Sequence, residues 1–321
     1  MKKLLFVYNP HAGKEALKPK LSDAIDIFVK AGYEVTIYPT QESRDAYRKV
    51  KEYNADDYDL VVCSGGDGTI DEVVTGMMGR EEKDPIGYIP AGTVNDFASS
   101  LYIPKDVLAA ADNAVHGVPF SCDIGKFNDG VFVYIAAFGL FTDVSYETNQ
   151  DLKNVLGHLA YLLEGAKRLL KVPSYQMKIT HDEGTIEGEF FYGMVTNSRS
   201  VGGVRNMIGK DVVFDDGLFE VTLIKKPKSV LQLQEIIASL LIEQINTEYA
   251  HTFRTSKITF ESVEEVAWTL DGEYGGHHTD VVVENAQKAV QIMVPEDKVE
   301  ELMEKSETKE IAEAADVEEI E

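Results

Sequence analysis

One short stretch of the chain combines glycine, aspartate and threonine at a spacing suited to phosphate chemistry. Residues 65–69 read Gly-Gly-Asp-Gly-Thr and follow the apolar run "LVVC". Glycines between a strand and a helix let backbone N–H groups approach a phosphate, and the helix N-terminus adds favourable partial charge. Asp67 would repel a phosphate, so its presence predicts an intervening divalent cation, most naturally Mg²⁺. On spacing alone, a helix cap remains the alternative for Asp67.

Two further carboxylate pairs lie beside glycines. Asp215 and Asp216 precede Gly217, and Asp271 and Glu273 flank Gly272. Asp-Gly is a strong signal for a hairpin turn, so on sequence alone a hairpin explains both pairs.

The elements that position these residues alternate between strand and helix in the first part of the chain. Continuous apolar strands separated by helices predict a parallel sheet covered on both faces. Ligands bind such sheets beyond the carboxyl ends of the strands. Four turns follow predicted strands and should share one rim: Asn9–Gly13, Thr40, Gly65–Thr69 and Ala91–Thr93. The strands are predicted at 3–10, 33–40, 58–66 and 85–92, with helices at 16–32, 43–55, 71–79 and 93–103.

After this region the pattern changes to short alternating strands separated by Gly, Asp and Asn turns, which predicts a β-sandwich. Two helical stretches, 151–171 and 228–246, interrupt it. The fold class is therefore α/β followed by β: a doubly wound α/β domain (1–126) and a β-sandwich domain (127–294). The active site is expected in the cleft between the domains.

The last segment, 295–321, is expected to return to the first domain. From Glu296 on it holds 12 acidic and 3 basic residues, and its apolar residues Val299, Leu302, Met303 and Ile311 have helical spacing. This pattern predicts a solvated terminal helix, with an acidic docking tail as the alternative.

Composition excludes several classes of protein. The formal net charge of −24 argues against a nucleic-acid partner. Two cysteines provide no disulfide framework and favour a reducing cytoplasm. No uninterrupted apolar run reaches the length of about 18 residues that a membrane-spanning helix needs. The seven histidines show no metal-ligand spacing.

Taken together, the motifs resemble a known family. "GGDGT", with "NPHAG" before it and "PAGTVNDFA" after it, looks like the catalytic domain of the diacylglycerol kinase and sphingosine kinase superfamily. More closely, the chain resembles the soluble bacterial diacylglycerol kinases, because "DDGLFEV" and "LDGEYGG" follow in the family's order. "GGDG" alone is weak evidence, since NAD kinases and phosphofructokinases contain it too. The five motifs together are specific, and the resemblance covers nearly the whole chain.

The resemblance implies a role for each motif. Asp67 and Asp96 would organise the catalytic Mg²⁺, partly through water. A second, structural Mg²⁺ would be bound by the Asp216 carboxylate and the carbonyls of Val213 and Leu218. The residues that the resemblance assigns to ATP are Asn9, Pro10, His11, Ala12, Gly13, Thr40, Gly65, Gly66, Asp67, Gly68, Thr69 and Thr93.

A kinase also needs a group that accepts the proton of the attacking hydroxyl from within about 3 Å. The resemblance places this base in "LDGEYGG", with Glu273 favoured and Asp271 as the alternative. Two residues depart from the family's pattern. Ala12 replaces a serine and loses one hydroxyl, and Asp71 replaces an asparagine. The added charge of Asp71 would weaken nucleotide binding unless Mg²⁺ offsets it.

The implied function is ATP-dependent phosphorylation of diacylglycerol to phosphatidate in bacterial phospholipid metabolism. Three alternatives stay open. The substrate could be another long-chain lipid alcohol (a sphingoid base or a prenol) or a soluble molecule, as in NAD kinases, or the protein could be a non-catalytic nucleotide-binding regulator. A cytoplasmic enzyme acting on a lipid must also reach the membrane surface. Residues 157–173 and 224–245 combine an apolar face with basic residues, which fits either core helices or a peripheral membrane patch. The oligomeric state is not determined, and a homodimer stays open.

Overall fold

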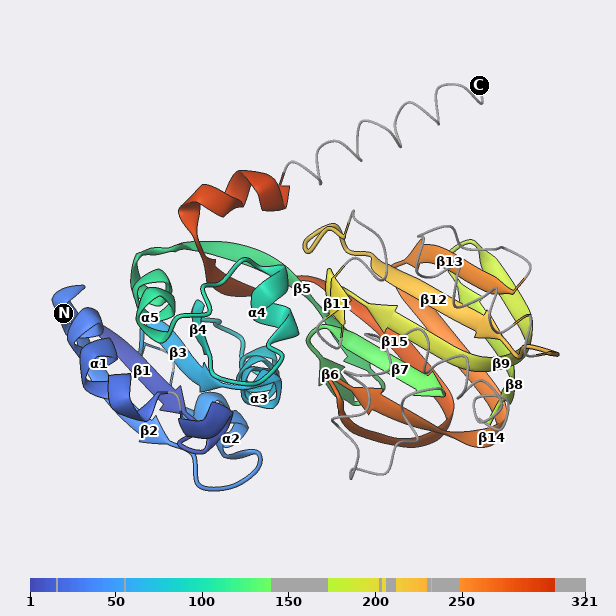
Figure 1. The fold of residues 1–321 in the computed structure, drawn as a ribbon, viewed down its shortest axis with the longest axis horizontal. Helices are drawn as coiled ribbons and strands as arrows, with labels where there is room; N and C mark the ends of the chain where they lie inside the picture. Colours follow the sequence, from blue (N-terminus) through green and yellow to red (C-terminus); the bar gives the residue numbers. More distant parts are fainter. Residues whose placement is uncertain are drawn as a thin grey trace. The chain divides into compact units, whose positions relative to one another are not determined.

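The computed structural model divides the chain into two compact units, each described here by itself (Figure 1). The first unit contains Met1–Ile124, Val213–Asp216 and the chain from Gln287 on. The second contains Gly125–Val212 and Gly217–Ala286. The residues described are 1–15, 17–54, 56–139, 173–201, 204–205, 212–229, 232 and 249–303. The predicted helix at 151–171, most of the one at 228–246 and the tail beyond 303 lie outside these residues.

The first unit is built on a parallel sheet, as its sequence pattern predicts. Its strand order is β2-β1-β3-β4, and the end of β15 pairs with β4 through Ile292 and Ile86. All four β1–β4 strands run parallel. Strands β3 and β4 are buried along their whole length, which explains their continuous apolar sequence. The strands are β1 (Lys2–Tyr8), β2 (Tyr33–Pro39), β3 (Leu60–Gly65) and β4 (Ile86–Pro90).

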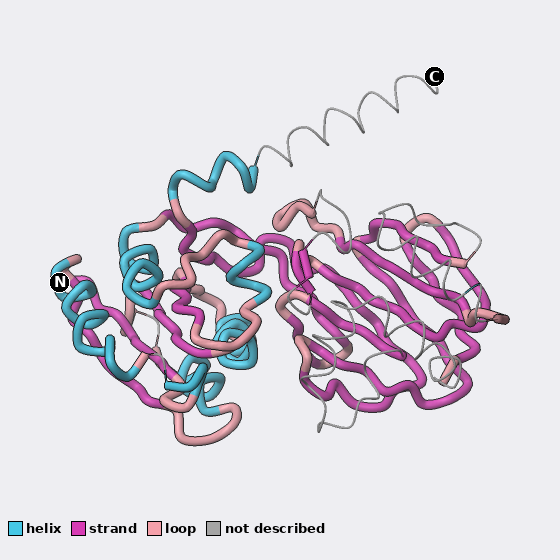
Figure 2. The backbone as a smooth tube through the Cα atoms, in the orientation of Figure 1, coloured by secondary structure: helices cyan, strands magenta, loops and turns pink. Residues whose placement is uncertain are grey.

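Helices cover both faces of this sheet (Figures 1 and 2). Helix α1 packs with α5, and α2 packs with α3. The predicted helix at 16–32 begins only at Leu21, because Pro19 lies in a short 3₁₀ turn ahead of it. The helices are α1 (Leu21–Lys30), α2 (Asp45–Glu52), α3 (Asp67–Met78), α4 (Asp96–Ser100) and α5 (Val107–His116), with 3₁₀ turns η1 (Ala12–Glu15), η2 (Lys18–Lys20) and η3 (Glu296–Lys298).

The described part of the second unit is mostly strand (Figure 2), and these strands pair antiparallel, which confirms the predicted β-sandwich class. Its main sheet order is β13-β12-β9-β7-β14-β15, and β8 pairs with both β14 and β9. The strands are β5 (Val118–Phe127), β6 (Gly130–Phe132), β7 (Ile135–Gly139), β8 (Tyr175–His181), β9 (Gly184–Thr196), β10 (Ser200–Val201), β11 (Val204–Arg205), β12 (Phe219–Lys225), β13 (Ala250–Thr255), β14 (Lys257–Leu270) and β15 (Glu273–Val294).

The core of the second unit is aromatic. The Trp268 ring lies 5.1 Å from Phe127, 4.9 Å from Phe138 and 5.0 Å from Phe260, measured between ring centroids. These pairs are close enough for favourable edge-to-face and tilted ring contacts. Trp268 therefore supports the strand β14, which ends at the turn containing Asp271.

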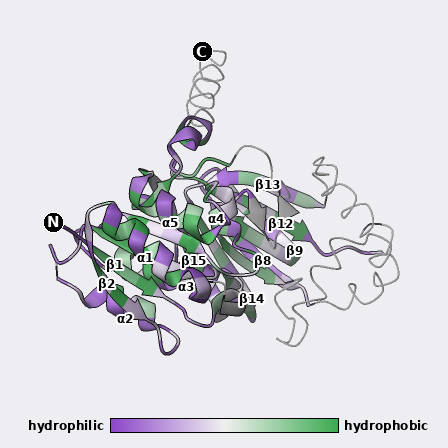
Figure 3. Ribbon diagram, turned by 60° about the vertical axis from the view of Figure 1, so that its left-hand side comes forward, coloured by the Kyte–Doolittle hydropathy of each residue, from purple (hydrophilic) through white to green (hydrophobic). Residues whose placement is uncertain are grey.

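Hydrophobic residues follow the strands of the sheets, while the helices carry hydrophobic and hydrophilic residues on different sides (Figure 3). This distribution is typical of helices that cover a sheet and face solvent on the other side. Within the described residues, no helix is long and apolar enough to cross a membrane.

Candidate functional site

The first unit contains a topological switch point between β1 and β3. From β1 the chain passes to β2 on one side, and the later strands β3 and β4 are added on the other side. Doubly wound sheets bind ligands in the crevice beyond the carboxyl ends of the strands at such a point. Here these two ends carry the sequences "NPHAG" and "GGDGT". The two glycine-containing motifs therefore lie where the fold itself predicts a ligand.

The loop after β1 is fixed by its own asparagine. The Asn9 N–H donates to the Ser64 carbonyl at 2.9 Å, and Asn9 Oδ1 accepts the His11 N–H at 2.9 Å. Gly13 has φ +54°, and a Cβ there would lie only 1.6 Å from the Ala91 carbonyl oxygen. Glycine is thus required at 13 so that this loop can lie against the turn after β4.

The turn after β3 leads directly into α3. Gly66 precedes the helix, Asp67 is its first residue, and the Thr69 N–H donates to the Gly66 carbonyl at 2.9 Å. The Gly65 carbonyl accepts the Ala91 N–H at 2.7 Å, so this turn also contacts the one after β4. Backbone N–H groups at the start of a helix are suited to binding a phosphate. The helix α3 begins at the rim, as this chemistry requires.

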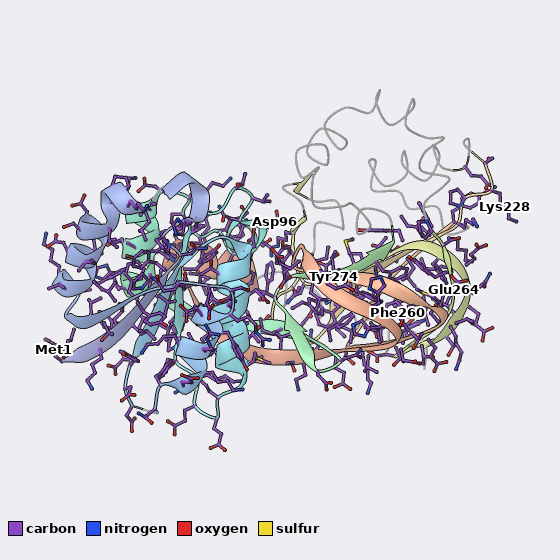
Figure 4. All side chains as sticks on the ribbon, turned by 90° about the horizontal axis from the view of Figure 1, so that it is seen from below. Met1, Asp96, Lys228, Phe260, Glu264 and Tyr274 are labelled. Carbon is purple, nitrogen blue, oxygen red and sulfur yellow. The ribbon has the colours of Figure 1, made fainter. Side chains whose placement is uncertain are left out.

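Asp67 and Asp96 are brought together through Asn95. The Asn95 N–H donates to Asp67 Oδ2 at 3.1 Å, and Asn95 adopts a left-handed conformation with φ +55°. Its side chain exchanges two hydrogen bonds of 2.9 Å with the backbone of Gly92. Asp96, the next residue, is the first of α4 (Figure 4). It is only 2% exposed. The two aspartates that the sequence selected thus belong to one connected set of loops.

The remaining residues expected at this rim differ in exposure. The Thr40 N–H donates to the Tyr8 carbonyl at 2.9 Å, which holds the chain after β2 beside β1. Thr69 is buried against Gly65, whereas His11, Gly68 and Thr93 are exposed. Asn9, Pro10, Ala12, Gly13 and Gly66 are half-buried.

A buried tyrosine lies beneath this rim. The Tyr88 hydroxyl donates to the Gly65 carbonyl at 3.1 Å. Burial raises the pKa of Tyr88 well above its ordinary value, and the charge of Asp67 raises it further. Tyr88 therefore acts as a neutral hydrogen-bond donor that fixes the first glycine of the turn.

The donor set at Asp67 and Asp96 fits Mg²⁺. Both side chains offer carboxylate oxygens, the ligands that this hard cation prefers. Within the part of the chain that the structure describes, no three acidic, histidine or cysteine side chains gather into a metal site. Mg²⁺ commonly uses one or two carboxylates and completes its shell with water and substrate phosphates. Two carboxylates on loops joined through Asn95 are compatible with that mode.

The turn at 213–218 provides a second set of oxygen donors. Val213 is fully buried, and Gly217 has φ +80°, which closes the turn beside Asp216. The Phe214 carbonyl accepts the Asp123 N–H at 2.7 Å, so the segment is anchored to β5 within the first unit. A carboxylate and backbone carbonyls in a tight turn fit a hard cation. The division between the two units falls inside this turn, just before Gly217 and Leu218.

In the second unit, Asp271 and Glu273 belong to a two-residue hairpin between β14 and β15. Leu270 pairs with Glu273, while Asp271 and Gly272 have φ values of +51° and +84°. Positive φ at both central residues defines the type I′ turn, for which Asp-Gly is a preferred sequence. The hairpin interpretation of this motif is therefore correct.

The two carboxylates of the hairpin have different environments. Asp271 is 6% exposed, and its Oδ2 accepts the Val133 N–H at 2.5 Å. Its Oδ1 accepts the N–H groups of Tyr134 at 2.9 Å and Ile135 at 3.0 Å. Glu273 is exposed. Asp271 holds the hairpin onto the start of β7, whereas Glu273 faces solvent.

Comparisons with known proteins decide the family. Residues 3–127 match the model of the diacylglycerol kinase catalytic domain, and residues 135–294 match that of the YegS C-terminal NAD kinase beta sandwich-like domain. The chain is 34% identical over 303 residues to a diacylglycerol kinase of Bacillus subtilis (strain 168), covering 94% of this chain and 99% of that protein. The chain belongs to the diacylglycerol kinase family.

Other relatives agree with this assignment. A diacylglycerol kinase of Staphylococcus aureus (strain bovine RF122 / ET3-1) is 33% identical over 305 residues, covering 94% of this chain and 95% of that protein. The crystal structure of a diacylglycerol kinase from Bacillus anthracis str. Sterne has a TM-score of 0.75 at 27% identity. That match covers 93% of this chain and 99% of the crystallised one. The predicted resemblance to this lipid kinase family is confirmed.

Two residues of the site were not selected by sequence reasoning. Asn95 links Asp67 to α4 through its N–H. An asparagine directly before Asp96 could have indicated a tight turn there, because asparagine tolerates the left-handed backbone conformation that it adopts. Asp123 is 1% exposed, and its Oδ1 accepts the Lys288 N–H at 2.7 Å. A single acidic residue inside the apolar strand "FSCDIGKF" was the signal for Asp123. Asn95 fixes the loop that bears Asp96, whereas Asp123 holds Lys288 with its side chain and the turn before Asp216 with its backbone N–H.

The contacts of Asp271 lead to a prediction about stability. Asp271→Asn replaces one acceptor oxygen by an NH₂ group facing backbone N–H donors, so at least one bond to a buried charge is lost. We expect the free energy of unfolding to fall by about 1.5–3 kcal/mol, measured by urea denaturation. Glu273→Gln, two residues away on the exposed side, should change it by less than about 0.5 kcal/mol. Equal stability of the two variants would contradict the anchoring role of Asp271.

Proposed function

We propose that the protein is an ATP-dependent lipid kinase that transfers the γ-phosphoryl group of ATP to the hydroxyl of diacylglycerol, giving phosphatidate. The observation that carries this proposal is the hydrogen bond from the Asn95 N–H to Asp67. It joins the turn after β3, at the switch point of the sheet, to the residue before Asp96. A carboxylate in a phosphate-binding turn is expected in an enzyme that uses a divalent cation with a nucleotide.

The ATP phosphates would be bound by the turn at 65–69 and the loop at 9–13. Support comes from the start of α3 at Asp67, because the N-terminus of a helix presents backbone N–H groups to a ligand. The close contact between Gly13 and Ala91 and the bond from Ala91 to Gly65 keep the three turns together. A preorganised set of N–H groups binds phosphate without a cost for reordering the loops.

Asp67 and Asp96 would hold Mg²⁺ directly or through water. When bound, the cation supplies neutralising charge to the phosphates as the transferred group leaves. Asn95 keeps the two aspartates in register, because its N–H fixes one oxygen of Asp67 and its side chain fixes Gly92. Asn95 would therefore orient the two carboxylates proposed to bind the metal without itself contacting the reacting atoms.

Glu273 would accept the proton of the attacking lipid hydroxyl. Its side chain is exposed, whereas both oxygens of Asp271 accept backbone N–H groups of residues 133–135. A base must approach the hydroxyl to within hydrogen-bond distance, which an exposed carboxylate at a hairpin can do. Asp271 would support the hairpin that presents Glu273. This division of roles favours Glu273 over Asp271 as the base.

A lipid acceptor requires a peripheral contact with the membrane surface. In the described residues, Lys226 and Lys228 lie just after β12, and Lys228 is exposed (Figure 4). Basic residues are attracted to anionic lipids even when the net charge of the protein is negative. Cytoplasmic location and a homodimer remain predictions from the sequence.

A labelling assay tests the proposed acceptor. The protein is incubated with γ-labelled ATP, Mg²⁺ and mixed micelles that contain diacylglycerol, sphingosine or a prenol, with NAD as the soluble acceptor. We expect the highest kcat/KM for diacylglycerol. Labelling of NAD alone would overturn the lipid proposal, and labelling of sphingosine or prenol alone would reassign the acceptor.

The turn at 213–218 gives a prediction about metal binding and stability. If Asp216 holds a structural cation, added Mg²⁺ should raise the Tm of the parent protein, because a ligand that binds only the native state stabilises it. Asp216→Ala should remove this rise, measured by differential scanning calorimetry with and without Mg²⁺. Nucleotide is omitted, and Asp67→Asn serves as the control for the other proposed site. An identical rise of Tm with Mg²⁺ in Asp216→Ala and in the parent would contradict the cation site and support a turn without a bound metal.

A further inference from the structure

Helix α4, which begins with Asp96, lies between two residues with left-handed backbone. Asn95 precedes the helix with φ +55°, and Tyr102 follows it with φ +57°. Non-glycine residues adopt this conformation at an energetic cost, so contacts elsewhere must maintain it. The helix has five residues, too few to be stable by its own hydrogen bonds. The position of Asp96 thus depends on the packing of the buried Phe97 and Ala98 and on what holds the two flanking residues.

The two ends of α4 are held by different parts of the first unit. Asn95 is held inside the site, by Asp67 and Gly92. Tyr102 is held by the C-terminal segment: its hydroxyl donates to Glu301 Oε1 at 2.5 Å. The Lys298 ammonium lies 5.4 Å from the centre of the Tyr102 ring and 3.2 Å from Glu301 Oε2. One carboxylate therefore binds both the tyrosine and the lysine that contacts its ring.

The C-terminal segment is itself anchored. It follows β15 through η3, and residues 299–303 are helical (Figure 1). Val294 before it and Leu302 within it are fully buried. The Glu301 hydrogen bond raises the pKa of Lys298, so the lysine stays charged near neutral pH. Because Leu302 is buried, Glu301 is fixed relative to the unit and can restrain Tyr102.

We propose that Tyr102 and Glu301 are positioning residues for Asp96, and that the C-terminal segment thereby sets the geometry of the proposed metal site from outside it. The proposal rests on the role given to Asp96 under the proposed function. At the far end of the helix, the Leu101 N–H donates to the Phe97 carbonyl and the Ile103 N–H to the Ala98 carbonyl, one hydrogen bond each. Because the helix has only five residues, loosening this end lets its first residue move.

The test uses Tyr102→Phe and Glu301→Gln, each of which weakens the same bond. Tyr53→Phe is the matched control. The Tyr53 hydroxyl also donates to a carboxylate of the first unit, Asp84 at 2.6 Å, but Tyr53 follows α2, outside the turns of the site. All three variants keep their rings or chain lengths, so each should fold. Asp96→Asn reports whether Asp96 affects the use of Mg²⁺ at all.

Two measurements are made on the full chain. The first is the Mg²⁺ concentration that gives half the maximal rate of phosphoryl transfer. We expect it to rise about 3–10-fold in Tyr102→Phe and Glu301→Gln, and to stay unchanged in Tyr53→Phe, because a hydrogen bond to a charged group contributes about tenfold to an equilibrium. The second is hydrogen exchange of the amides of Ser99, Leu101 and Ile103, which should become faster in the first two variants only.

The outcomes separate this inference from the proposed function. Unchanged exchange in Tyr102→Phe and Glu301→Gln would overturn the inference. An unchanged Mg²⁺ requirement in both variants, with a raised one in Asp96→Asn, would overturn it too. If Asp96→Asn itself leaves the Mg²⁺ requirement unchanged, the role of Asp96 fails, and the positioning inference fails with it. If Tyr53→Phe changed the Mg²⁺ requirement and the amide exchange as much as Tyr102→Phe, Tyr102 would be a general stabilising residue. That result would contradict the proposal.

Discussion

Replacing Glu273 by glutamine is expected to lower kcat by about 10²–10⁴-fold, the usual contribution of general-base catalysis. Glutamine keeps the size and hydrogen bonding of glutamate but cannot take the proton of the lipid hydroxyl. The residue lies in a hairpin of the second unit, so the KM for ATP should stay nearly constant. Steady-state kinetics at saturating Mg²⁺, with ATP and diacylglycerol varied separately, measure both values.

The control for this variant is Asp271→Asn, assayed at a temperature where it is folded. Asp271 accepts three backbone N–H groups, so its loss should act through stability and the shape of the hairpin. If the folded Asp271→Asn protein has no turnover while Glu273→Gln retains most of it, the two roles are reversed.

Asp67→Asn is expected to lower turnover by about 10³-fold or more, since metal-ion charge stabilisation contributes several kcal/mol and about 1.4 kcal/mol is tenfold. The asparagine oxygen still accepts the Asn95 N–H, so the turn should remain folded. Only the charge that would hold Mg²⁺ is removed. Turnover and Tm are measured on the same preparation.

Asp71→Asn is the matched control, because Asp71 lies one turn further along α3 and the substitution makes the same chemical change. It should bind ATP as tightly as the parent or more tightly, with turnover retained. A parent-like rate for Asp67→Asn at saturating Mg²⁺ would contradict the metal role of Asp67.

Much of the first unit was predictable because its inner strands β1, β3 and β4 are largely buried. The predicted strands agree with β1 to β4 within a few residues, because continuous apolar runs such as 60–63 mark the buried strands. The convergence of the strand ends follows from the parallel order, so the rim with residues 65–69 follows as well. The start of α1 was less accurate, since the apolar spacing continues across Pro19.

The contacts made by single side chains were not predictable. Asp271 and Glu273 are both acidic residues beside a glycine, and only the fold reveals that the first accepts the N–H groups of residues 133–135. That partner segment lies far away in sequence, and periodicity carries no information about it. For the same reason, nothing in "SSLYIP" indicates that Tyr102 contacts Glu301 near the other end of the chain.

The most direct measurement of the central claim is the fate of the γ-phosphoryl group. The parent, Asp67→Asn and Glu273→Gln are each given γ-labelled ATP and diacylglycerol in mixed micelles, and labelled lipid and ADP are quantified together. The account predicts one labelled phosphatidate for each ADP formed by the parent, and strongly reduced amounts of both for the two variants. ADP formed without labelled lipid, or equal labelled phosphatidate from all three proteins, would contradict it.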